Sequence, residues 1–445
     1  MKRKFLICLL WCATGLAALA QSKSNKIEFT EYTLPNGLHV ILHQDNSTPN
    51  VAVSVLYHVG SKNEQEGRTG FAHFFEHLMF EGTENIDRGE YSSLVQNAGG
   101  ALNANTSFDR TYYYELLPSN QLALGLWLEA ERMRHAKVDQ TGVETQRKVV
   151  QEEKRERIDN QPYGSILENT FALAYTEHPY KTTPIGTFKD LNNAKIEEFR
   201  DFYKTFYVPN NATLSIAGDI DVDETRKMIE KYFADIPKGT QEIPRPDVTE
   251  PKQTEERRKT VYDNIQLPAV VEAYHIPAQG TEDHYALSML TTLLSGGESA
   301  RLPKALVDKQ QIAVAAQSIP FPTEDPGLFL VFAVANMGVE ADKLEQAMDT
   351  EINRVKTEEL SDREFQKLRN QMESSFVQQN STVAGRAENL ANYHVYYGDA
   401  NLINTELERF MKVTKADIKR VANEYLTKEN RVVLHYLPKS AQPKQ

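Results

Sequence analysis

Two distant segments of the chain show the same order of elements, a helix followed by a buried strand. Periodic apolar residues predict a helix over 196–203 and a strand over 212–216, and the same signals recur over 418–425 and 431–435. Between them, residues 239–258 hold three prolines among charged residues, a composition typical of a linker. Because 445 residues exceed what one core usually supports, we expect a duplicated α+β unit. Two unrelated α+β domains are the alternative.

The predicted boundaries place a first domain at 21–238, the linker at 239–258 and a second, homologous domain at 259–440. Residues 1–20 have the three parts of a signal peptide: a basic start, an apolar run and a small-residue cleavage site at Ala18–Ala20. Past this cleavage site, no stretch is long and apolar enough to span a membrane.

Cysteine use and charge indicate the compartment and exclude some partners. Cys8 and Cys12 both lie in the signal peptide, so the exported chain has no thiol and no disulfide. We expect a periplasmic or secreted protein. A net charge of −12 argues against nucleic acid and anionic membranes as partners.

Within the first domain, the apolar segments 38–42 and 51–59 are joined by a polar turn and predict a β-hairpin. Strands are also expected at 102–108, 111–117 and 212–217, and helices at 91–98, 121–135, 143–158, 196–206 and 223–233. In the second domain we expect strands at 270–275 and 328–335, and helices at 285–294, 341–358 and 362–379.

The segment His73-Phe74-Phe75-Glu76-His77 has the pattern H-x-x-E-H, an inverted zincin motif. Residues four apart share one face of a helix, so both imidazoles can reach one metal ion. Glu76 lies beside that face. Two imidazoles and a carboxylate are what a hydrolytic zinc site needs, because they leave a coordination position open and place a base near water.

A catalytic zinc site needs a third protein ligand, and the helix expected at 143–158 offers Glu152 and Glu153. Neighbouring residues on a helix point about 100° apart, so only one of them can easily face inward. Gln146, Val149, Val150 and Glu153 share one helix face, whereas Glu152 lies on a charged flank. The geometry therefore favours Glu153. Without the H-x-x-E-H motif, both glutamates would be interpreted as surface charges.

Several segments together resemble the insulinase/pitrilysin family of zinc metallopeptidases. The chain is similar to its two-domain bacterial members and to the catalytic subunit of mitochondrial processing peptidase. The resemblance rests on these segments: Leu34–Leu38, Gly70–Thr83, Gly99–Ala104, Val149–Glu153, His178–Tyr180, Tyr207–Asn211 and Gly218-Asp219. It implies two related α/β rolls, each an antiparallel-rich sheet with helices packed on one face. The family's spacing between the second histidine and the third ligand again selects Glu153.

The resemblance also implies a role for each site residue. His73, His77 and Glu153 would hold zinc, and Glu76 would be the general base that accepts a proton from the attacking water. Asn103 and Ala104 match the edge strand on which the family binds an extended peptide by β-augmentation.

The chain departs from the family pattern in two places. Gln146 stands where many members carry a glutamate, which removes a negative charge near the expected site. Val307 and Val314 stand where the second domain of self-sufficient members carries an arginine and a tyrosine that contact substrate. We therefore expect a heterodimer with a homologous subunit that supplies the Arg/Tyr pair. A homodimer and a chain that acts alone are the alternatives.

The leading hypothesis is an exported zinc endopeptidase that acts on peptides or unfolded segments. A non-catalytic peptide-binding or assembly subunit is the alternative from another class, and a zinc enzyme with a non-peptide substrate is the third. The complete H-x-x-E-H motif with Glu153 favours the enzyme, because binding a strand requires neither a metal nor a base.

Overall fold

The structure, a computed structural model, describes residues 26–443. The expected signal peptide, residues 1–20, lies outside the described residues. No helix in the described range is long and apolar enough to cross a membrane.

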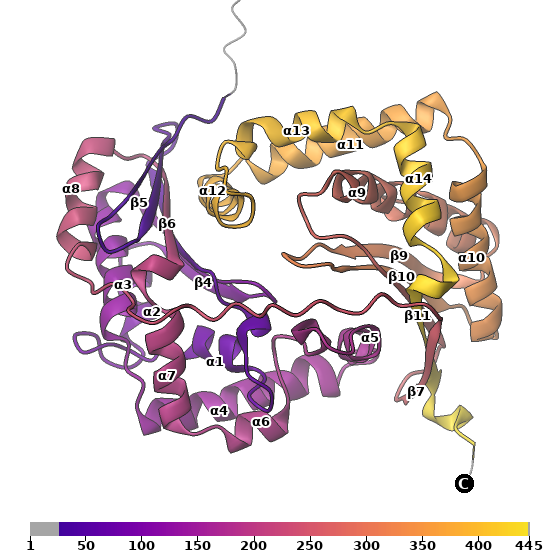
Figure 1. Cartoon of the computed structure of the whole chain (residues 1–445), viewed down its shortest axis with the longest axis horizontal. Coiled ribbons are helices and arrows are strands. Elements are labelled where there is room, and N and C mark those ends of the chain that lie inside the picture. Colours follow the sequence, from indigo (N-terminus) through magenta and orange to yellow (C-terminus); the bar gives the residue numbers. More distant parts are fainter. Residues whose placement is uncertain (1–25, 444–445) are drawn as a thin grey trace, which may run out of the picture.

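Two sheets organise the described chain (Figure 1). The first contains β1 (Thr30–Thr33), β2 (His39–Gln44), β3 (Asn50–Tyr57), β4 (Ala101–Thr106), β5 (Thr111–Pro118) and β6 (Ala212–Gly218). The second contains β7 (Arg257–Asp263), β8 (Ala269–His275), β9 (Ala313–Phe321), β10 (Leu328–Ala335) and β11 (Arg431–Pro438). We call residues 26–238 the N-terminal half and residues 259–443 the C-terminal half.

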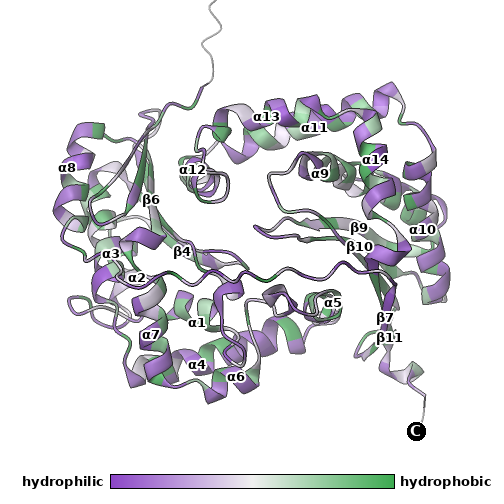
Figure 2. Ribbon diagram, in the orientation of Figure 1, coloured by the Kyte–Doolittle hydropathy of each residue, from purple (hydrophilic) through white to green (hydrophobic). Residues whose placement is uncertain are grey.

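The helices of the N-terminal half are α1 (Phe71–Leu78), α2 (Glu90–Asn97), α3 (Leu122–His135), α4 (Gln140–Lys154), α5 (Ile166–Ala174), α6 (Phe188–Asn193), α7 (Ile196–Phe206) and α8 (Val222–Phe233). Those of the C-terminal half are α9 (Glu282–Ser295), α10 (Ala341–Thr357), α11 (Asp362–Gln379), α12 (Val383–Tyr397), α13 (Leu402–Lys412) and α14 (Lys415–Tyr425). Hydrophilic residues dominate the outward side of peripheral helices such as α8 (Figure 2).

The strand order confirms the duplication. The first sheet runs β2-β6-β3-β5-β4, with β1 added outside β2, and the second runs β7-β11-β8-β10-β9. The strands correspond one to one in chain order. Each sheet has one parallel pair, β2 with β6 and β7 with β11, and its other neighbours are antiparallel. The α+β class with two related units is therefore correct. The domain boundaries predicted from the sequence stay a prediction.

The hairpin predicted from segments 38–42 and 51–59 is wrong. These segments form β2 and β3, but β6 lies between them, parallel to β2 and antiparallel to β3. All seven residues of β6 are buried, because its edges pair with β2 and β3 while the first core covers one face and helix α12 of the C-terminal half covers the other.

Other elements differ at their ends or were not expected. The helix expected at 143–158 begins at Gln140 and passes at its end into a π-helical turn, Arg155–Asp159. The last two linker residues belong to β7, which the sequence patterns did not indicate. Strand β9 and helices α12 and α13 were also not predicted.

One helix of each half packs against the sheet of the other half. Helix α12 covers β3 and β6, where Ala387 meets Ala52 and Ala217. Helix α5 covers β8 and β11, where Phe171 and Ala174 join the core of the second sheet. We expected helices on one face of each sheet. The structure adds a helix from the opposite half on the other face of each sheet (Figure 1).

The linker crosses the front of the molecule in Figure 1 and bonds to both halves. Arg245 donates to the backbone oxygen of His58, and the Glu250 carboxylate accepts from the backbone amides of residues 176–178. At the other end, the Gln253 amide donates to the backbone oxygen of Arg431 at 2.6 Å. These contacts hold the linker against both halves.

Candidate metal centre

Helix α1 carries the H-x-x-E-H motif and presents it on one side. Phe71, Phe74, Phe75 and Leu78 are buried on the other side, where Phe71 stacks on Phe199 of α7 at 4.5 Å between ring centroids. The apolar positions thus fix the rotation of the helix, and the remaining positions point away from the core. His73, Glu76 and His77 are in those positions and line a cavity of about 500 Å³.

The start of α1 is fixed by two residues whose role the sequence analysis missed. Gly70 caps the helix with a φ of 91°, and a Cβ there would lie 2.9 Å from the backbone oxygen of Ile185. The Glu64 carboxylate accepts from the backbone amides of Gly70 and Ala72 at 2.9 and 2.8 Å. Burial raises the pKa of Glu64 to about 8, and the hydrogen bonds from these backbone amides oppose part of that effect. Only the glycine and the turn before the motif gave a signal in the sequence.

Glu153 extends from α4 to both histidines. Its Oε2 lies 3.1 Å from Nε2 of His77 and 3.5 Å from Nε2 of His73. One ligand atom from each of the three residues lies within 4.8 Å of the others. Two imidazole nitrogens and one carboxylate oxygen around a common point are a donor set that fits zinc. Glu152 is exposed and pairs with Arg155 at 2.9 Å, so it points elsewhere.

The electrostatics of these residues suit metal binding. Burial and the neighbouring His77 lower the pKa of His73 to about 4, so its imidazole is neutral at pH 7. A hydrogen bond from His77 lowers the pKa of Glu153 and keeps its carboxylate ionised. Neutral imidazole and ionised carboxylate are the forms that coordinate a metal. Arg157 also contacts Oε1 of Glu153 at 2.7 Å, a contact that no sequence pattern indicates.

Glu76 faces the same cavity and is connected to β4. The hydroxyl of Thr106, the last residue of β4, donates to Oε2 of Glu76 at 2.6 Å. Burial raises the pKa of Glu76, and the Thr106 hydroxyl opposes part of that effect. Thr106 holds one oxygen, so the other is available to a water in the cavity. Thr106 falls within the strand predicted at 102–108, but no sequence pattern indicates its contact with Glu76.

Strand β4 forms one wall of this cavity. It is the edge strand of its sheet, paired with β5 alone, and Asn103 and Ala104 line the cavity together with Phe80. The structure therefore brings all six residues expected at the centre of the site to one cavity: His73, Glu76, His77, Asn103, Ala104 and Glu153.

Gln146 lies on α4 but does not line the cavity. Its amide donates to Oε1 of Glu81, and Oε2 of Glu81 lies 2.6 Å from Nε of Arg88. A glutamate at this position would set two carboxylates against each other, whereas the amide can donate. Val149, expected on the inward face of the same helix, is 43% exposed.

The two valines in the C-terminal half have different surroundings. Val307 is partly buried and packs against the second core, whereas Val314, on the edge strand β9, is 50% exposed. Val314 is therefore not a core position.

Comparisons with known proteins agree with this geometry. Residues 39–187 match the profile of Insulinase (Peptidase family M16), and residues 193–372 match that of the Peptidase M16 inactive domain. The chain is 34% identical to the zinc protease PqqE of Helicobacter pylori, over 94% of this chain and 95% of that protein. The chain belongs to the insulinase family, M16.

Further relatives extend the comparison. A probable mitochondrial-processing peptidase subunit beta of Arabidopsis thaliana is 26% identical, over 88% of this M16 chain and 75% of that protein. The crystal structure of a protease from Helicobacter pylori superposes with a TM-score of 0.89 at 32% identity, covering 92% of this chain and all of that one. By this relationship, the chain is an M16 zinc protease.

Proposed function

We propose that the chain is an exported, zinc-dependent endopeptidase that hydrolyses peptides or unfolded segments bound in extended form. The observation that carries the proposal is the convergence of His73, His77 and Glu153 beside Glu76, in a cavity walled by the edge strand β4. The export signal at residues 1–20 supports a periplasmic or secreted location.

In this proposal, His73, His77 and Glu153 hold zinc, which supplies Lewis acidity toward water and the scissile carbonyl. Glu76 accepts a proton from the attacking water and delivers it to the leaving amine. The Thr106 hydroxyl keeps the Glu76 carboxylate turned into the cavity.

Strand β4 supplies the binding mode. An edge strand offers unpaired backbone groups, and a peptide can add to it as a further strand. Backbone pairing requires an extended substrate but tolerates many side chains. A folded protein would therefore be a poor substrate, and unfolded segments or peptides would be good ones.

A first experiment tests catalysis and metal together. The purified mature chain is assayed with a quenched peptide, and its zinc content is measured alongside. Glu76→Gln is expected to keep zinc and lose activity by a factor of about 10²–10⁴, because a neutral amide cannot accept the proton. A chain that binds zinc but hydrolyses no peptide, alone or with its partner, would favour the non-catalytic peptide-binding subunit.

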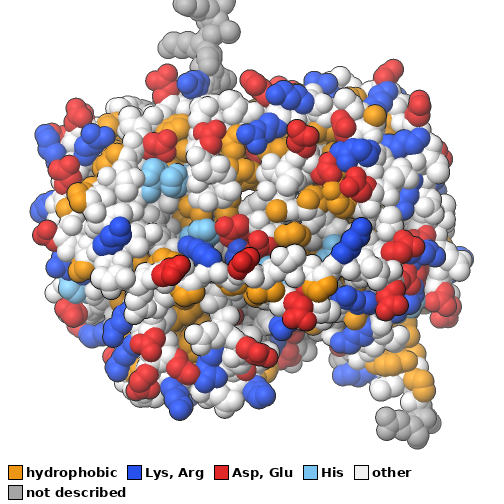
Figure 3. Space-filling model, viewed as in Figure 1, with side chains coloured by type: hydrophobic (Ala, Val, Ile, Leu, Met, Phe, Trp, Pro, Cys, Tyr) orange, Lys and Arg blue, Asp and Glu red, His pale blue; other side chains and the backbone are white. Residues whose placement is uncertain are grey.

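The partner in this proposal is a homologous subunit that supplies the Arg/Tyr pair. Val307 and Val314 cannot donate hydrogen bonds to a substrate carbonyl, and the exposure of Val314 leaves its strand open to contact. A heterodimer is therefore the proposed active form, with a homodimer as the second candidate. Acidic and basic side chains are interspersed on the face shown in Figure 3, which fits a protein partner better than a nucleic acid.

Reconstitution tests the partner. Sedimentation of the isolated chain gives its oligomeric state, and its peptidase activity is then titrated with a homologous exported chain that carries the Arg/Tyr pair. Weak activity that rises with partner concentration is expected. Full activity of the isolated chain, unchanged by the homologue, would exclude the heterodimer.

A further inference from the structure

The turn between β4 and β5, residues 107–110, is held by the C-terminal half. Arg110 donates through Nη1 to Oδ1 of Asn392 at 2.7 Å and forms an ion pair with Glu388; both partners lie on α12. Its Nη2 also donates to Oδ1 of Asn105, in β4, at 3.2 Å. The Arg110 side chain is 13% exposed and connects α12 to the more exposed Asn105 of β4.

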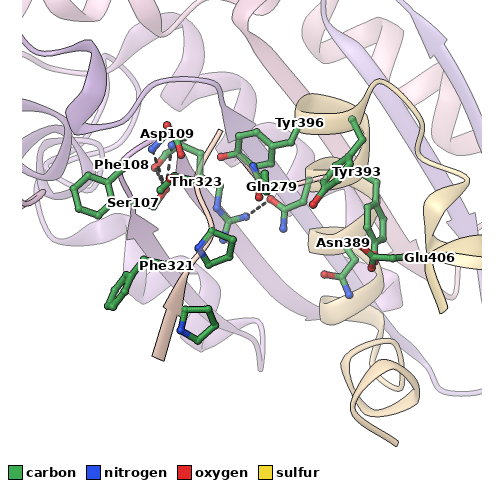
Figure 4. Close-up of a pocket in the computed structure, with 15 residues that line it drawn as sticks. Ser107, Phe108, Asp109, Gln279, Phe321, Thr323, Asn389, Tyr393, Tyr396 and Glu406 are labelled. Carbon is green, nitrogen blue, oxygen red and sulfur yellow. Dashed lines mark hydrogen bonds between the residues drawn. The ribbon is translucent and has the colours of Figure 1, made fainter. Parts of the chain in front are cut away.

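A second element of the C-terminal half reaches the same turn. The loop between β9 and β10 brings the backbone amide of Glu324 to Oδ2 of Asp109 at 3.0 Å. The Tyr180 hydroxyl donates to the other oxygen of Asp109 at 2.6 Å. Figure 4 shows this junction, with Tyr396 of α12 pointing toward the segment Ser107–Asp109. The turn is thus held from two sides.

This attachment has consequences at the cavity because β4 has only one neighbouring strand. Its pairing with β5 leaves its outer edge without a strand, β5 itself pairs with β3, and the turn is where the C-terminal half is hydrogen-bonded to the hairpin. The end of β4 carries Asn105, which Arg110 holds, and next to it Thr106, which holds Glu76. A short series of contacts therefore leads from α12 to the general base.

We infer that Arg110 is a positioning residue through which the C-terminal half sets the substrate strand β4 and, through Thr106, the orientation of Glu76. The inference rests on the proposed function for the roles of β4 and Glu76. It gives the C-terminal half a task within its own chain, although the half carries Val307 and Val314 in place of the Arg/Tyr pair.

The chain provides a matched control for this inference. Arg386, two residues before Glu388 on α12, forms an ion pair with Asp45, beyond the end of β2. This pair also joins α12 to the N-terminal half, but Asp45 lies outside the strand that walls the cavity. Arg110→Gln and Arg386→Gln each remove one ion pair between the halves, and they differ in whether β4 is involved. Glu388→Gln keeps Arg110 and removes its charged partner.

The first measurement is hydrogen–deuterium exchange of residues 101–106 in the metal-free mature chain. Arg110→Gln is expected to speed exchange in this strand about tenfold, since a hydrogen bond to a charged group typically contributes that much. Glu388→Gln should act in the same direction, and Arg386→Gln should leave the strand unchanged. Equal exchange in Arg110→Gln and Arg386→Gln would overturn the inference.

The second measurement is steady-state hydrolysis of a quenched peptide by the zinc-loaded chain with its partner. Arg110→Gln should lower kcat/KM about tenfold with a clear rise in KM, because a loosely placed strand binds peptide less well. If Arg110→Gln only reduced the fraction of folded enzyme, the apparent kcat would fall and KM would stay unchanged. That result would overturn the inference. If the wild-type chain hydrolyses no peptide, the proposed function fails, and the exchange result still decides the role of Arg110.

Discussion

Glu324 connects the two halves through a buried lysine, and its replacement by glutamine should destabilise the protein in a pH-dependent way. Its Oε2 lies 2.5 Å from Nζ of Lys62 and 3.0 Å from Nε2 of His58. Lys62 is 6% exposed and also contacts Asp325 and Asp109 at 3.1 and 3.2 Å. Replacing Glu324 therefore leaves the buried Lys62 ammonium group with two of its three carboxylate partners.

The pKa of Glu324 sets the size of the effect. Burial alone would raise this pKa, but His58 and Lys62 outweigh burial and lower it to about 2. A carboxyl group with an ordinary pKa near 4.5 in the unfolded chain then contributes on the order of 3 kcal/mol to stability at pH 7. Because the folded pKa is the lower one, this contribution is complete above pH 4.5 and is lost as the pH falls toward 2. At pH 3.5 it should be about 2 kcal/mol, and near pH 2.5 less than about 1 kcal/mol.

Urea unfolding of the wild type and Glu324→Gln at several pH values measures this contribution. Trp127, the one tryptophan in the described range, lies in α3 and reports on the N-terminal half, while far-UV circular dichroism reports on both halves. Glu373→Gln is the control, because Glu373 is exposed on α11 and makes none of the described ion pairs. A cost below about 1 kcal/mol at pH 7, or a cost unchanged between pH 7 and pH 3.5, would refute the reasoning.

Two further predictions concern the metal cavity. Glu153→Gln should weaken zinc binding at least about tenfold by competition with a chromogenic chelator, while Glu152→Gln should bind as the wild type does; the opposite order would show that the third ligand is misassigned. Thr106→Val should lower kcat about tenfold with zinc content unchanged, because Glu76 loses the hydroxyl that orients it, and Thr106→Ser should restore the activity. An inactive Thr106→Ser, or a fully active Thr106→Val, would argue against that role.

The parts of the site that the sequence predicts well are those set by local geometry. The spacing of His73 and His77 places both on one side of α1 whatever the rest of the chain does, because helical periodicity depends on neighbouring residues alone. The choice of Glu153 over Glu152 follows from the same periodicity applied to α4, and the observed contacts agree with it. Most of the predicted helices have nearly the expected bounds for this reason.

The parts that failed depend on contacts between distant segments. Nothing near β2 or β3 in the sequence indicates that β6 lies between them, so two strands joined by a turn were interpreted as a hairpin. The arginine at position 110 looks like an ordinary turn residue, because its partners Glu388 and Asn392 are far away in the chain. Likewise, Thr106 gains a role only once β4 lies against α1.

Because α5 covers the sheet of the C-terminal half and α12 covers the sheet of the N-terminal half, cutting the chain at the linker would uncover part of both sheets. A fragment ending at the linker would keep its first sheet but leave the surface around Ala52 and Ala217 without Ala387. The complementary fragment would lack Phe171 and Ala174 over the second sheet. Two copies of a single half could cover each other by trading one helix each, which is the arrangement of a domain-swapped dimer. The present chain thus has the architecture of such a dimer whose two subunits have been joined end to end by the linker.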